Sequence, residues 1–94
     1  DLEGANFSHA VLDGGSLARA TLEGTTLTEA SLKGTKLTGA QLESADLGGA
    51  TLADAKLDHA EMSECYLGAA KLMGATLDNA DLSGAARAGL DRNC

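Results

Sequence analysis

The sequence has no proline or tryptophan, and its only aromatic residues among 94 are Phe7 and Tyr66. Small globular cores draw much of their buried area from aromatic rings, so this composition argues against an ordinary core. Hydrophobic residues nevertheless make up 44% of the chain, a normal fraction that consists mostly of Ala and Leu. We therefore expect one domain whose core is built from small, uniform side chains.

Basic residues are also scarce, with seven Lys and Arg against 14 Asp and Glu and a net charge of −7. This balance disfavours direct nucleic-acid binding and attraction to anionic membranes. No apolar run approaches the roughly 20 residues of a spanning helix, so membrane insertion is not expected. Two cysteines, Cys65 and Cys94, form neither a disulfide framework nor a zinc motif, and they slightly favour a reducing compartment such as the cytoplasm.

A five-residue repeat dominates the chain. Large apolar residues occupy seventeen positions five residues apart: Leu2, Phe7, Leu12, Leu17, Leu22, Leu27, Leu32, Leu37, Leu42, Leu47, Leu52, Leu57, Met62, Leu67, Leu72, Leu77 and Leu82. A second series lies two residues before each large residue from Phe7 onward and ends at Ala85; it holds thirteen Ala together with Gly15, Thr25, Thr35 and Cys65. We predict that both series, Cys65 included, point inward and form the core.

A period of five fits neither an α-helix nor a regular strand. On a helix, each five-residue step would rotate the large residue by about 140°, so these residues would share no face and a helical bundle is the weaker alternative. In a short extended segment, residues two apart point the same way, which places the small and large series on one side. The remaining two residues form a corner, and four corners close a square coil of twenty residues.

The corner position, two residues after each large residue, has a matching composition. It is Gly in eight repeats, and His9, Asp54, His59 and Asn79 occupy four others. These residue types tolerate turns and positive φ comparatively well. The composition therefore supports a turn in every repeat.

The pattern Ala-[Asp/Asn/Ser/Thr]-Leu-x-x resembles that of the pentapeptide-repeat family, with clear instances at 45–49 and 80–84. The resemblance covers residues 1 to about 86. It implies an all-β fold, a right-handed quadrilateral β-helix or solenoid of about four coils with 20 residues each. Many family members have no known activity, and some act on DNA gyrase as acidic mimics of duplex DNA.

We place the β-helix at residues 1–84 and a change of register at 85–94. Arg87 stands where a Leu is due, and 88–92 match the repeat again three residues late. This segment is either a cap, with Leu90 across the last coil, or a loop after which the repeat resumes. The open ends of such a solenoid also permit end-to-end self-association.

Residues of repeats four apart stack on the same face. The face around Leu2 carries seven acidic residues and no Lys or Arg. Asp1 is one of them, and the candidate partner-binding residues are the other six: Glu3, Glu23, Glu43, Glu61, Glu64 and Asp81. Three of them, Glu3, Glu23 and Glu43, share one slot and should stack about 4.8 Å apart. The face either maintains solubility or docks a basic partner.

The sequence offers no catalytic, metal or cofactor site. His9 and His59 fall on opposite faces, so they form neither a metal pair nor a catalytic dyad. The carboxylates have no cleft that desolvates them, which leaves acid–base catalysis unsupported. Tyr66 points outward beside Leu67 and is either an aromatic surface contact or a simple cover.

Two functions remain after these exclusions. The first is a non-enzymatic structural or protein-interaction module that presents a rigid surface with one acidic face to a protein partner. The alternative is a DNA mimic that acts on a type II topoisomerase such as gyrase. DNA mimics of this family are longer and usually dimerise through a C-terminal helix, and this chain shows neither feature.

Overall fold

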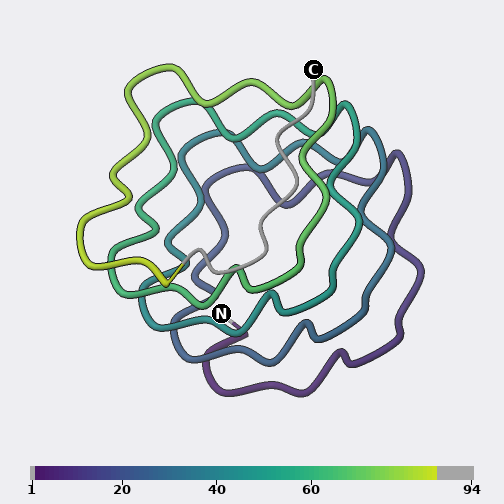
Figure 1. The fold of residues 1–94 in the computed structure, drawn as a ribbon, viewed down its shortest axis with the longest axis horizontal. Helices are drawn as coiled ribbons and strands as arrows, with labels where there is room; N and C mark the ends of the chain where they lie inside the picture. Colours follow the sequence, from purple (N-terminus) through teal and green to yellow (C-terminus); the bar gives the residue numbers. More distant parts are fainter. Residues whose placement is uncertain (1, 87–94) are drawn as a thin grey trace.

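The computed structural model describes residues 2–86, which wind into a stack of coils (Figure 1). Within this range the backbone forms no continuous helix or strand, and its regular structure consists of isolated bridges separated by two-residue turns. It therefore contains no helix that could cross a membrane. The helical-bundle alternative fails here because each repeat bends before a helical turn can form.

Parallel bridges join each coil to the next. The thirteen bridges run from Asn6 with Thr26 to Tyr66 with Ala86, and every one pairs residues 20 apart. The coils are linked by backbone hydrogen bonds, such as the one from Leu22 N to the Gln41 carbonyl oxygen at 2.7 Å. The bridging residue lies just before each large apolar residue, so the extended part of each repeat is very short.

Every repeat turns the chain in the same way. The amide of Ala5 donates to the Leu2 carbonyl oxygen at 3.1 Å, and the equivalent bond recurs along the chain. The third residue of each turn has a positive φ at all seventeen corner positions from Gly4 to Gly84. That conformation is typical of a type II turn.

The turns accept more residue types than the sequence indicated. Besides Gly and the four residues named above, positive φ occurs at Arg19, Glu29, Ser44, Glu64 and Ala69. Such a backbone is costly for a residue with a Cβ. The bridges and turn hydrogen bonds on either side impose it, so local preference alone did not identify these corners.

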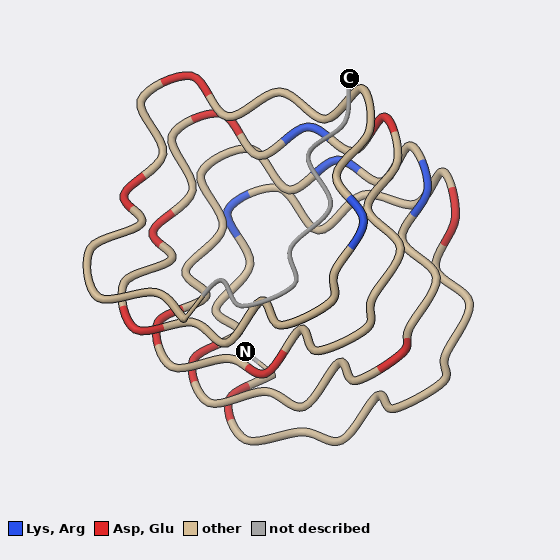
Figure 2. Ribbon diagram, in the orientation of Figure 1, with Lys and Arg blue, Asp and Glu red and all other residues tan. Residues whose placement is uncertain are grey.

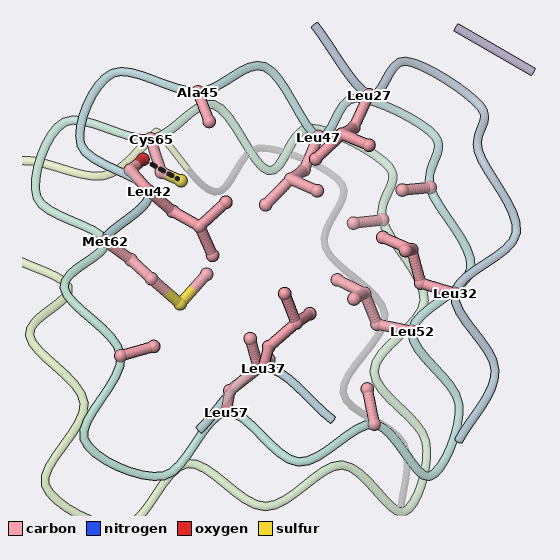
Figure 3. Packing of buried hydrophobic residues seen from close by; sticks show 14 of the residues in the cluster. Leu27, Leu32, Leu37, Leu42, Ala45, Leu47, Leu52, Leu57, Met62 and Cys65 are labelled. Carbon is pink, nitrogen blue, oxygen red and sulfur yellow. Dashed lines mark hydrogen bonds between the residues drawn. The ribbon is translucent and has the colours of Figure 1, made fainter. Parts of the chain in front are cut away.

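The large apolar residues point into the coil and stack on one another. Figure 3 shows Leu27 beside Leu47, Leu32 beside Leu52 and Leu42 beside Met62. From Leu22 to Leu72 every residue of this series is buried, whereas Leu2, Phe7, Leu12, Leu17, Leu77 and Leu82 are partly buried and pack against the same core. The outermost coils of the described range therefore bury less than the middle ones, and end-to-end association stays a prediction.

Three polar members of the small series are fully buried and each donates a hydrogen bond. Thr25 Oγ1 donates to the Leu2 carbonyl oxygen at 3.1 Å, and Thr35 Oγ1 donates to that of Leu12 at 2.9 Å. Cys65 Sγ donates to the Leu42 carbonyl oxygen at 3.3 Å (Figure 3). The small slot thus accepts a polar side chain that satisfies a backbone carbonyl 23 residues earlier.

The ladder continues through the last described residues. Ala85 N donates to the Leu82 carbonyl oxygen at 3.0 Å, and Ala86 N donates to that of Cys65 at 2.9 Å. The repeat pattern therefore persists to residue 86. The proposed cap or loop, including Arg87 and Leu90, otherwise lies outside the described residues.

Candidate docking surface

The acidic face is formed by the outward residues of the repeats around Leu2, Leu22, Leu42, Met62 and Leu82. Figure 2 shows acidic segments recurring from coil to coil. Five of the six candidate residues are exposed and Glu43 is half-buried; the exposed ones are Glu3, Glu23, Glu61, Glu64 and Asp81. The structure therefore brings the candidate residues to one side of the coil, with most of them open to solvent.

The carboxyl groups on this face interact with one another. A hydrogen bond with Glu3 raises the pKa of Glu23, and burial and the negative charges of Glu43, Glu3 and Glu61 add to the effect. A hydrogen bond with Glu43 raises the pKa of Glu61, again with a contribution from the Glu43 charge. Two carboxyl groups form such a bond only when one holds a proton, so the face binds protons more readily than isolated glutamates do.

The contact between Glu43 and Glu61 was not anticipated from the sequence. Glu43 follows its large residue, whereas Glu61 precedes the next residue of the same stack, Met62. Our expectation considered only carboxylates in the same slot. Glutamate side chains are long enough to reach from one slot to another on the neighbouring coil. The sequence did contain a sign of this contact: Glu43 and Glu61 are 18 residues apart, only two fewer than the 20 residues of a full coil.

Glu43 is the half-buried member of the acidic face. Its Oε1 atom is buried and has no hydrogen-bond partner among residues 2–86. The close contact between a basic and an acidic side chain within the described range joins His9 Nδ1 and Glu29 Oε1 at 3.4 Å, away from the acidic face. The negative charges of Glu23, Glu43, Glu61 and Glu64 thus have no basic partner in this part of the chain.

Asp81 is held differently from the glutamates. Its Oδ1 accepts hydrogen bonds from Ser83 N at 2.9 Å and from Ser83 Oγ at 2.6 Å. These bonds lower the pKa of Asp81. Asp81 consequently adds a fixed charge to the face while it also stabilises its own turn.

The other chemistry-bearing residues form no site among residues 2–86. No group of three or more His, Cys, Asp or Glu suited to a metal ion is present there, and no pocket opens in the described surface. Burial raises the pKa of the Cys65 thiol to about 12, so this thiol is a poor nucleophile. Cys94 lies outside the described residues.

The repeat can now be compared with known proteins. The pentapeptide-repeat model matches the chain in eight copies, through segments 1–39, 16–53, 35–72 and 50–85. The chain belongs to the pentapeptide-repeat family. Proteins of this family are right-handed β-helices, which agrees with the parallel bridges and the regular turns. A search of curated proteins returned no match.

Solved pentapeptide repeat proteins share this architecture. One from Nostoc is 30% identical, with a TM-score of 0.79, and the match covers 92% of this chain and 83% of that protein. One from the thylakoid lumen of Arabidopsis thaliana is 34% identical, with a TM-score of 0.59 and coverage of 90% and 59%. HetL, a Nostoc protein involved in heterocyst differentiation regulation, is 31% identical, with a TM-score of 0.50 and coverage of 93% and 48%.

Proposed function

We propose that this pentapeptide repeat protein is a non-enzymatic interaction module whose right-handed quadrilateral β-helix presents its acidic face to a basic protein partner. The observation that carries the proposal is the uncompensated charge at Glu43, which lies among further carboxylates and has a buried oxygen without a hydrogen-bond partner. A cationic group from a partner that contacts the exposed carboxylates around Glu43 would offset its negative charge. It would also relieve the repulsion between Glu43 and its neighbours.

The arrangement favours docking over a role in solubility alone. Solubility needs only net charge, which scattered carboxylates supply without close contacts. Here the carboxylates approach closely enough to share hydrogen bonds, which raises the pKa values of Glu23 and Glu61. Like charges held together on a sheet surface destabilise the fold. A role in binding explains why the carboxylates are clustered despite this cost.

A site-specific cross-linking experiment tests the proposal. A photo-cross-linking residue replaces Gln41, which is exposed on the acidic face, and in a second protein it replaces Lys56, which is exposed on another face. We expect a protein partner to cross-link at position 41 and not at 56. Glu23→Gln combined with Glu43→Gln should abolish that adduct.

A matched variant controls for the loss of two negative charges. Asp54→Asn with Asp78→Asn removes the same charge from exposed positions on other faces. This variant should cross-link at position 41 as efficiently as the wild type. Equal adduct yields from the two double variants would reject docking through the acidic face.

A DNA-mimicking action on a type II topoisomerase is the second candidate, and carboxylates on successive coils favour it. It makes a narrower claim than protein docking in general. The wild type should compete with duplex DNA for the enzyme at low salt, and the Glu23→Gln/Glu43→Gln variant should compete less well. If the wild type does not compete, mimicry is excluded and docking to another basic protein stands.

A further inference from the structure

The Tyr66 ring lies on a surface made of glycine backbone. A Cβ added to Gly48 would come within 2.9 Å of Tyr66 Cε2. A Cβ added to Gly68 would approach Tyr66 Cζ to 2.5 Å and Oη still more closely. The ring therefore reaches across two coils, and both glycines are buried beneath it. We call the ring of Tyr66 together with Gly48 and Gly68 the aromatic platform.

These two glycines are explained by the ring and not by the backbone. Both occupy the position directly after the large residue, and no other repeat from Leu2 to Leu82 has glycine there. Neither has the positive φ found at the corners, so a side chain would be compatible with the local backbone. Close approach of Tyr66 is the feature that requires the missing Cβ.

Tyr66 remains 48% exposed although it lies against the two glycines. Asp46 pairs with Tyr66 across the bridge between their coils, and Asp46 Oδ1 accepts a hydrogen bond from Gly48 N at 2.9 Å. This bond fixes the carboxylate close to the ring and leaves Oδ2 with no hydrogen-bond partner in residues 2–86. Exposed aromatic surface and a carboxylate oxygen thus lie close together.

We infer that the aromatic platform and Asp46 bind an arginine side chain of the partner protein. The planar guanidinium stacks on an aromatic face while its N–H groups donate to a carboxylate, a combination that the compact lysine ammonium cannot reproduce. The platform also adjoins the acidic face, because Glu64 lies at the turn that leads into Tyr66. The inference rests on the proposed function and adds the identity of the contacting group.

Three capped peptides test this assignment. Each contains four copies of one residue, which is arginine, lysine or citrulline, separated by glycine. Calorimetry at low salt gives the affinity of each peptide for the protein. We expect the arginine peptide to bind about threefold more tightly than the lysine peptide, and citrulline to bind most weakly. Tyr66 is the only tyrosine and tryptophan is absent, so intrinsic fluorescence of the wild type reports contact at the ring itself.

Variants separate the platform from the acidic face. Tyr66→Leu should make the arginine and lysine affinities equal, whereas Tyr66→Phe should retain the preference because the ring remains. Glu23→Gln with Glu43→Gln should weaken both peptides and leave their ratio unchanged. Circular dichroism establishes that each variant is folded.

The possible outcomes distinguish the two proposals. If arginine has no advantage in the wild type, or if Tyr66→Leu keeps that advantage, the platform assignment is overturned. If the affinities of both cationic peptides still fall when Glu23 and Glu43 are replaced, docking through the acidic face stands. A Tyr66-dependent arginine preference together with no effect of the two glutamates supports the platform and contradicts the proposed function.

Discussion

The buried Thr35 hydroxyl donates a 2.9 Å hydrogen bond to the carbonyl oxygen of Leu12, 23 residues earlier in the chain. This carbonyl also accepts the turn hydrogen bond from Gly15 N at 3.1 Å. One side chain therefore connects the interior of one coil to the turn of its neighbour. The stability of the solenoid consequently depends on polar contacts inside the coil as well as on stacked leucines.

Thr35→Val should reduce the free energy of unfolding by about 0.5–1.5 kcal/mol, because it removes this hydrogen bond and places a methyl group against a carbonyl oxygen. Urea denaturation measures the change. Thr38→Val, at an exposed position of the next repeat, is the control and should change stability by less than about 0.5 kcal/mol. Equal effects at the two positions would show that the buried bond contributes nothing.

Leu47→Ala should cost about 2–5 kcal/mol, because Leu47 is fully buried and stacked in the middle of the core. Leu47→Asp should prevent folding, since it places an unpaired charge in that stack. Leu12→Ala should cost less than Leu47→Ala, because Leu12 is only partly buried. Chemical denaturation ranks the variants, and a larger loss at Leu12 would contradict the described core.

The corner geometry predicts opposite effects for one substitution at two sites. Ala69 has a φ of 61°, so Ala69→Gly should stabilise the protein by relieving an unfavourable backbone conformation. Ala18 is exposed and has no positive φ, so Ala18→Gly should destabilise it by about 0.5–1 kcal/mol through added freedom of the unfolded chain. Thermal melts decide the sign, and destabilisation at both sites would refute the corner assignment.

The acidic face should make stability fall as pH rises above about 4.5. The folded state raises the pKa values of Glu23 and Glu61 above their ordinary 4.5, so it holds protons that the unfolded chain releases. Deprotonation of the folded state therefore weakens it as pH rises. Glu23→Gln with Glu61→Gln should flatten this dependence.

Denaturant unfolding measured across this pH range tests the sign. Asp13 and Asp81 act in the opposite direction, because hydrogen bonds lower their pKa values below the ordinary 3.8. The stabilisation from these two groups is lost as pH falls through their folded pKa values. The effect of the aspartates therefore lies at lower pH than the effect of Glu23 and Glu61. Stability that rises between about pH 5 and 7 in the wild type, or a double variant with unchanged slope, would exclude the carboxyl pairs.

The periodicity of the sequence was sufficient to identify the family, the coil of short extended segments and the inward position of Leu47. Composition alone was insufficient at the corners, where Ala69 and Glu29 adopt positive φ because the neighbouring bridges constrain them. Local pattern also missed the buried donor role of Thr35. That role depends on a carbonyl in another coil, which a five-residue motif does not encode.

The candidate site was predictable in part, because the repeat determines which residues share a face. Repeat arithmetic placed Glu23 and Glu43 on one face, because equivalent slots recur every 20 residues. It did not predict the contact of Glu43 with Glu61 or the position of the Tyr66 ring, since both depend on side-chain directions between slots. Gly48 and Gly68, directly after Leu47 and Leu67, were the sequence feature that indicated where the Tyr66 ring lies.

The central claim is that the acidic face binds a basic partner, and the salt dependence of that binding tests it most directly. The partner cross-linked at position 41 is purified, and its affinity is measured from low to high salt for the wild type and the two double variants. We predict that Glu23→Gln/Glu43→Gln weakens binding and flattens its salt dependence, while Asp54→Asn/Asp78→Asn matches the wild type. Identical affinities and salt slopes for all three proteins would contradict the claim.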